Sequence, residues 1–129
     1  MYKELVISLI IVISIFVIDY IAQKYTDDAM NEITTNLSSL QEELKEEKQD
    51  YDKVTKHVNS AHNRWIEHQN RMSFFIEHNE LEKVETSFIS GKSLIESQEY
   101  EEALSEIEKT IFILNHINEK YSFDMKNIF

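Results

Sequence analysis

Five histidines are the residues most able to do chemistry in this sequence, because imidazole binds transition metals and titrates near neutral pH. Two metal ligands on one helix face must lie three or four residues apart. His57 and His62 are five apart, and His62 and His68 are six apart, so neither pair fits. The Glu-x-x-His motif of di-iron bundles is also absent, because an apolar or aromatic residue precedes His68, His78 and His116 at that distance.

A second metal hypothesis needs contact between distant parts of the chain. His78 and Glu80 could join His116 around a metal or small ligand if the segments that carry them pack together. A structural role for His78 is the simpler interpretation, because a histidine near a helix C-terminus interacts favourably with the helix dipole. We therefore keep these three as ligand candidates only, and we predict no metal site and no cofactor.

Other catalytic arrangements are not recognisable. The chain has no Cys, which excludes thiolate catalysis, and no Ser is spaced with a base. Neighbouring carboxylates such as Glu42 and Glu43 fall on an expected polar helix face. Trp65 is the single tryptophan, and we interpret it as a packing anchor, with ligand stacking as the alternative. We expect a protein without enzymatic activity.

The composition predicts an all-α fold. The 129 residues include no Pro and one Gly, the residues on which sheets and loop-rich folds depend for turns. The net charge of −11 makes nucleic-acid binding unfavourable, because an acidic chain repels a phosphate backbone. The length allows one domain of ordinary size.

The first helix is predicted to be a membrane anchor. Residues 5–18 contain no charge, and residues 5–22 would span roughly 27 Å as a helix, close to the hydrocarbon thickness of a bilayer. Tyr2 at one end, and Tyr20 and Tyr25 at the other, are typical of the membrane interface. A signal peptide cut after Ala22 would put Tyr20 where a small residue is required. A buried core helix would show a polar face, which this segment lacks.

The membrane orientation is weakly encoded, since Lys3 flanks one side of the span and Lys24 the other. The short charged head favours a cytoplasmic N-terminus, with the bulk of the chain outside. Thr26 could start a new helix, or the membrane helix could continue straight through it.

Four further seams have the three-and-four spacing of packed helices. The clearest occupies residues 51–75 and carries Trp65. The expected buried positions are Ile33, Leu37, Leu40 and Leu44; Tyr51, Val54, Val58, Ala61, Trp65, His68, Met72 and Phe75; Leu81, Val84, Phe88, Gly91 and Ile95; and Tyr100, Ala103, Leu104, Ile107, Ile111, Leu114 and Ile117. Gly91 on a seam indicates a close helix approach.

The expected turns separate these seams. Residues 45–50 contain no apolar side chain, and Asp50 is a good N-cap, which favours a turn there. One long helix remains the alternative, because the heptad phase continues through Glu47 to Tyr51. We expect further turns at residues 78–80 and before a fourth helix capped by Ser97, and we expect residues 121–129 to dock on the bundle.

The chain resembles a family of membrane-anchored bacterial proteins known as domain-of-unknown-function family 4363. The resemblance rests on Asp50-Tyr51, on Trp65, on the His-Asn-Glu at 78–80, and on the endings at 116–120 and 126–129. The family usually has Trp at position 51 and Pro at position 118, where this chain has Tyr and Asn. The resemblance implies an anchored helical domain and lends no activity.

We therefore predict a single transmembrane helix followed by an antiparallel bundle of about four helices. Residues 1–25 form the anchor and residues 26–129 the bundle. The expected partners are the lipid bilayer, through residues 5–22, and an unidentified protein, for which Trp65, His78, Glu80 and His116 are the candidate contacts. An interaction or sensing module outside the cytoplasmic membrane is the leading hypothesis. The alternatives are an oligomeric coiled-coil stalk and a bundle that binds a metal or small ligand near His78.

Overall fold

A computed structural model describes the backbone of residues 1–128 and the side chains of residues 1–121. It contains four α-helices in the order α1 (Tyr2–Lys45), α2 (Tyr51–Met72), α3 (His78–Glu96) and α4 (Tyr100–Ile128), and the described part of the chain has no strand. The predicted all-α fold is confirmed. The expected docking of residues 121–129 lies outside the described side chains, apart from Tyr121.

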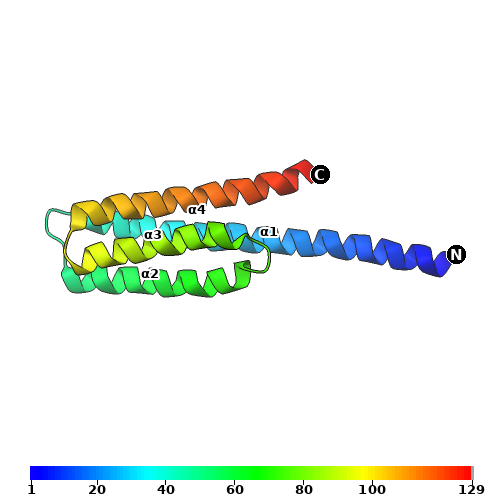
Figure 1. The fold of residues 1–129 in the computed structure, drawn as a ribbon, viewed down its shortest axis with the longest axis horizontal. Helices are drawn as coiled ribbons and strands as arrows, with labels where there is room; N and C mark the ends of the chain where they lie inside the picture. The colour runs from blue at the N-terminus through cyan, green and yellow to red at the C-terminus, as the bar shows by residue number, and fades with distance from the viewer. Residues whose placement is uncertain (129) are drawn as a thin grey trace.

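The helices form an antiparallel up-and-down bundle. Each helix packs against the next in the chain, and α4 closes the bundle by packing against α1. Figure 1 shows that the N-terminal part of α1 extends well beyond the other helices, on the same side as the end of α4. This geometry is that of a four-helix bundle with short connections.

α1 is one continuous helix with two different surroundings. Its large apolar side chains between residues 5 and 21 are 41–67% exposed, and none of them is buried in the core. From Thr26 onward its apolar stripe is buried. Thr26 does not start a new helix, because its hydroxyl donates to the carbonyl of Ala22 one turn earlier. The helix therefore runs without interruption from the exposed apolar part into the core.

The chain turns between α1 and α2, as the polar gap favoured. α2 begins at Tyr51, and the side chain of its N-cap Asp50 accepts a hydrogen bond from the Lys53 amide at 3.3 Å. Gln49 stabilises the turn by donating to the carbonyl oxygens of Leu44 and Glu46. The alternative of one long helix through residues 33–75 is therefore wrong.

The end of α2 corrects one prediction. We expected the turn at residues 78–80, but α2 already ends at Met72 and α3 begins at His78. The reason is tertiary: the Met72 carbonyl accepts from the amides of Phe75 and Ile76, and the turn puts Ile76 into the core. His78 thus lies at a helix N-terminus and does not cap a C-terminus.

The turn between α3 and α4 corrects a second prediction. Ser97 ends α3 and does not cap α4; its hydroxyl donates to the carbonyls of Ser93 and Leu94. The next residue, Gln98, has a φ of 60°. The Gln98 amide donates to the Ile95 carbonyl and the Glu99 amide to the Leu94 carbonyl, which is the Schellman pattern of helix ends.

The core confirms most of the seam positions. Among the described side chains, twenty apolar ones are buried, from Ala29 to Ile117, and they include all of the predicted positions in α1 and four of the five predicted in α3. Gly91, the fifth, is also buried. The exceptions are Tyr51 and Phe75, each 38% exposed, and Tyr100, Leu104 and Ile111, which are partly buried. Gly91 is a close approach, as predicted: a Cβ there would lie 3.1 Å from Cδ1 of Ile107 on α4.

Gln98 provides a test of the α3–α4 turn. The left-handed conformation costs a residue with a Cβ about 1–2 kcal/mol, and glycine avoids that cost at a smaller entropic penalty. We expect Gln98→Gly to raise the free energy of unfolding by about 0.5–1 kcal/mol. Urea titration followed by the fluorescence of Trp65, which is fully buried, measures it. Gln98→Ala is the control, with a change within about 0.5 kcal/mol. A glycine variant less stable than the parent contradicts the assignment.

Candidate functional site

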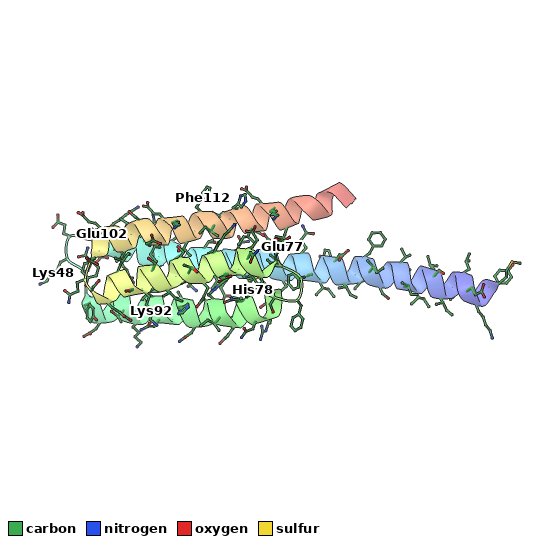
Figure 2. All side chains as sticks on the ribbon, in the orientation of Figure 1. Lys48, Glu77, His78, Lys92, Glu102 and Phe112 are labelled. Atoms are coloured by element: carbon green, nitrogen blue, oxygen red, sulfur yellow. The ribbon has the colours of Figure 1, made fainter. Side chains whose placement is uncertain are left out.

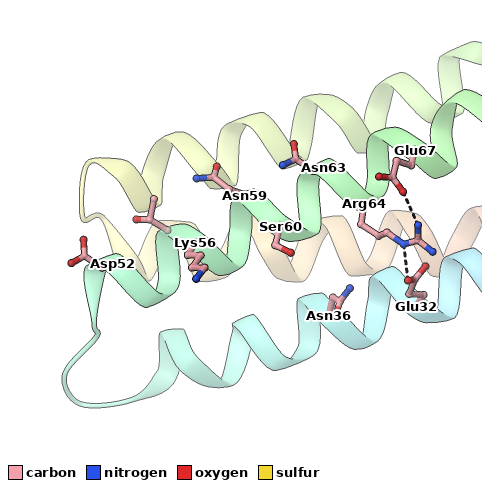
Figure 3. Close-up of a pocket in the computed structure, with 10 residues that line it drawn as sticks. Glu32, Asn36, Asp52, Lys56, Asn59, Ser60, Asn63, Arg64 and Glu67 are labelled. Carbon is pink, nitrogen blue, oxygen red and sulfur yellow. Dashed lines mark hydrogen bonds and ion pairs between the residues drawn. The ribbon is translucent and has the colours of Figure 1, made fainter.

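An open polar groove of about 810 Å³ runs along the face between α1 and α2. Figure 3 shows α2 providing most of its lining, with two residues coming from α1. The lining combines three carboxylates, two cations, three amides and two hydroxyls: Glu32, Asp52, Glu67, Lys56, Arg64, Asn36, Asn59, Asn63, Thr55 and Ser60. Positive and negative groups nearly balance here, in contrast to the strongly acidic chain as a whole.

The helical repeat of α2 explains how this face arises. The α2 residues of the groove recur at spacings of three and four between positions 52 and 67, just as its buried residues do between 54 and 72. Side chains at those spacings lie on one side of a helix. α2 therefore carries two parallel stripes, one apolar and buried and one polar and facing the groove.

Arg64 organises the end of the groove nearest the apolar part of α1, as Figure 3 shows. Its Nε donates to Oε1 of Glu32 on α1 at 2.7 Å, and its Nη1 donates to Oε2 of Glu67 at 2.6 Å. The guanidinium holds the pKa of the Glu32 carboxyl below its usual range, with a smaller contribution from His68. The two carboxylates in turn raise the pKa of Arg64.

His68 extends this network into the core. Its side chain is only 5% exposed, and its Nε2 contacts Oε2 of Glu32. Because an ionised carboxylate can only accept, Nε2 is the donor of that bond. The other ring nitrogen, Nδ1, lies 2.7 Å from the Tyr25 hydroxyl, which can donate to it in the neutral ring. The chain Tyr25–His68–Glu32–Arg64 ties α1 to α2.

Two more histidines of α2 pair with carboxylates of neighbouring helices. Nδ1 of His57 lies 3.1 Å from Glu43 on α1, and Nε2 of His62 lies 2.8 Å from Glu85 on α3. All three pairs are partly or largely buried. The histidines of α2 therefore act between helices, which explains why their spacing fits no metal motif on a single helix.

The structure separates the candidate residues chosen from sequence. Trp65 is fully buried and stacks on Phe88 of α3, so it cannot contact a ligand at the surface. His78 is exposed in the first turn of α3, and its nearest acid is Glu82. Figure 2 shows His78 at the end of the bundle from which α1 protrudes.

The other two candidates also have separate surroundings. Glu80 is largely buried and contacts Lys120 at 3.5 Å and Lys83 at 3.9 Å, and it raises the pKa of the Lys120 ammonium. His116 is exposed and stacks on Phe112. Among the described residues, no three His, Asp or Glu side chains form a group that could hold a metal ion. The hypothesis of a ligand site around His78, Glu80 and His116 gains no geometric support.

Comparison with known proteins identifies the family. The family model described as "Domain of unknown function (DUF4363)" matches residues 20–128. The chain belongs to this family. No curated protein and no solved structure matches it. The DUF4363 match starts just inside the end of the apolar segment and covers the whole bundle, which agrees with the resemblance found from helix ends and core residues.

Sequence reasoning missed the Glu32–Arg64–His68 network and the groove. The polar stripe of α2 was detectable, because its spacing is as regular as that of the core stripe on the same helix. The pairing of Glu32 with His68 was not, because 36 residues and a helix turn separate them. Only the register of α1 against α2 brings these residues together.

Acidification tests the network around Glu32. Because the folded pKa of Glu32 is lowered, its stabilising contribution is present above the unfolded value near 4.5 and is lost as the pH falls through the folded pKa. We expect Glu32→Gln to cost about 1 kcal/mol at pH 7, since the ion pair with Arg64 is partly exposed. The difference from the parent should shrink on acidification below pH 4.5, and urea titrations across pH measure it.

The matched control is Glu42→Gln, which removes an exposed carboxylate on the same helix whose only described ion pair is with Lys45. This substitution should leave the free energy of unfolding nearly unchanged both at pH 7 and below pH 4.5. A Glu32→Gln deficit that stays constant with pH would contradict a charge-based role for Glu32.

Proposed function

We propose that this DUF4363 protein is a single-span membrane protein that displays its bundle outside the cytoplasmic membrane and binds another protein through the α1–α2 groove. It performs no catalysis of its own. The observation that carries the proposal is the division of α1, whose apolar side chains are exposed before Ala22 and buried after Thr26 on one unbroken helix.

Membrane anchoring is supported by both composition and packing. α1 is the one described helix that is long and apolar enough to cross a membrane, and its apolar window is entirely unburied in the bundle. So large an apolar surface is unfavourable in water, and hydrocarbon is the environment that matches it. A buried core helix would not leave these side chains exposed. A cleaved signal sequence is disfavoured by Tyr20 at the required small-residue position.

An outward orientation is compatible with the charges next to the span. Between residues 23 and 44 the bundle side carries only Lys24, so it lacks the enrichment in Lys and Arg that is typical of cytoplasmic flanks.

Protein binding at the groove is supported by its chemistry. Ten polar side chains converge on one open face, with charges of both signs that could pair with a partner's charges. A mixed polar face suits reversible association better than a permanent apolar interface.

The absence of catalysis is supported by the burial of the one network that resembles catalytic machinery. The network with the most catalytic character is Tyr25–His68–Glu32, but His68 is almost fully buried and its two ring nitrogens are occupied by Tyr25 and Glu32. A general base must reach the proton it takes, and this imidazole cannot reach a substrate in the groove.

Anchoring and orientation can be tested in one strain series. We expect the full chain to stay in the membrane fraction after alkaline carbonate, and Ile10→Lys with Ile13→Lys to release it, since each central lysine costs about 2.5–3.5 kcal/mol of insertion. The control, Phe112→Lys with Ile89→Lys, replaces two exposed apolar residues of the bundle and should stay bound.

A Lys92→Cys variant should react with an impermeant maleimide in intact cells, because the parent has no cysteine. Labelling only after lysis would reverse the orientation.

Partner binding can be tested by photocrosslinking in the same cells. A photoreactive amino acid at Ser60, which is exposed in the groove, should form a discrete adduct with another protein. The same amino acid at Ser105, exposed on α4 away from the groove, should not. Equal adducts from both positions, or none from Ser60, would contradict binding at the groove. An adduct with a second copy of this chain would instead indicate that the groove is an interface between copies of the protein.

A further inference from the structure

The loop between α2 and α3, residues 73–77, exposes two aromatic side chains at the end of the bundle nearest the apolar part of α1. Phe74 is 89% exposed and Phe75 38% exposed, whereas the next residue, Ile76, is buried. The Glu77 amide donates to the Tyr121 hydroxyl of α4 at 2.9 Å, which fixes the loop to the bundle. Figure 2 shows Glu77 and His78 at this end and Lys48 at the opposite end. The aromatic pair therefore directly precedes two residues, Ile76 and Glu77, that are fixed to the bundle.

An apolar groove of about 310 Å³ lies between this loop and α1. It is lined by Ile18, Ile21, Ala22, Tyr25, Arg71 and Phe75. Ile18 and Ile21 belong to the exposed apolar segment, and Phe75 belongs to the loop. The groove therefore joins the last turn of the apolar segment to the tip of the bundle.

The position of this groove along α1 sets the depth of the loop relative to the membrane. If residues 5–22 cross the hydrocarbon, Ile18 and Ile21 occupy the last turn inside it, because a helix rises about 1.5 Å per residue. Phe75 shares a groove with both, so it must lie at the same depth or just outside it. That is the interfacial zone in which aromatic side chains are enriched.

Arg71 adds a charge at the same level. It is exposed at the end of α2, lines the groove, and has no hydrogen bond or ion pair among the described residues. Guanidinium binds phosphate with two parallel hydrogen bonds, and an apolar groove beside it can accept the start of an acyl chain.

We propose that the α2–α3 loop is a second membrane contact, in which Phe74 and Phe75 insert into the membrane interface. Arg71 binds a phospholipid phosphate, and the adjoining groove holds the part of an acyl chain next to the headgroup. This proposal rests on the anchoring role of α1 proposed above. The bundle then meets the bilayer at two points, α1 and the loop, which fixes its tilt and rotation relative to the membrane.

Depth-dependent quenching on the full chain tests the proposal. The chain is reconstituted in vesicles of phosphatidylcholine and phosphatidylglycerol, and an environment-sensitive fluorophore is attached to Ser73→Cys, next to the two aromatics. Lipids with a spin label near the headgroup should quench this probe at least twofold more than they quench a probe at Lys48→Cys. A probe at Val12→Cys should be quenched most by labels deep in the acyl chain.

Two substitutions then separate the aromatic and phosphate contacts. Phe74→Ser and Arg71→Glu should each at least halve the quenching at position 73, and Lys48→Glu, the same charge reversal at the far end, should leave it unchanged. Phe74→Ser should leave the thermal unfolding of the bundle unchanged, because Phe74 is almost fully exposed.

The outcomes distinguish the two proposals. No deep quenching at position 12 would mean that α1 does not span the bilayer and would overturn the proposed anchoring. Deep quenching at position 12 with none at position 73 would leave the anchor intact and overturn the loop contact. Quenching at position 73 that survives Arg71→Glu would overturn the phosphate contact of Arg71.

Discussion

The continuity of α1 is the constraint on which the rest of the structure depends. Helices kink at proline, at glycine or where a side chain enters the hydrogen-bond ladder, and α1 contains neither proline nor glycine. The apolar segment and the bundle segment therefore share one axis. The point at which exposed apolar residues give way to a single buried stripe, between Ala22 and Thr26, fixes how far the bundle stands from the end of the apolar segment. The positions of the α2–α3 loop and of Tyr25 along the axis of α1 follow from that point.

The four helices differ in how extensively they pack against one another. α4 packs extensively against both α1 and α3, whereas α2 packs least against α3. α2 compensates with polar contacts, since His57 and His68 pair with acids of α1 and His62 with an acid of α3. Polar pairs are directional, so they set the register of α2 while leaving its other side free for the groove.

The heptad pattern predicted the core because burial follows helical periodicity, and that periodicity is local information. Leu81, Val84, Phe88, Gly91 and Ile95 are all buried, as the spacing indicated. The helix ends were less predictable. Ser97 has the side chain of an N-cap but ends α3, because left-handed Gln98 already separates the helices. Asp50 was predicted correctly, since a polar segment precedes it and an unbroken seam follows it. At residues 73–77 the burial of Ile76 decided the boundary, and that is a tertiary event.

The candidate site failed to emerge from sequence for a related reason. A search for chemistry along one helix tests spacings of three and four, whereas the histidines here meet their partners across helices. His68 and Glu32 are 36 residues apart, and their contact depends on the turn at residues 46–50. Once that turn is known, antiparallel pairing puts the end of α2 beside the middle of α1, and Arg64, four residues before His68, must then reach the same carboxylate. The network is thus a consequence of the first hairpin, and the polar stripe of α2 is exposed because the hairpin turns its apolar stripe inward.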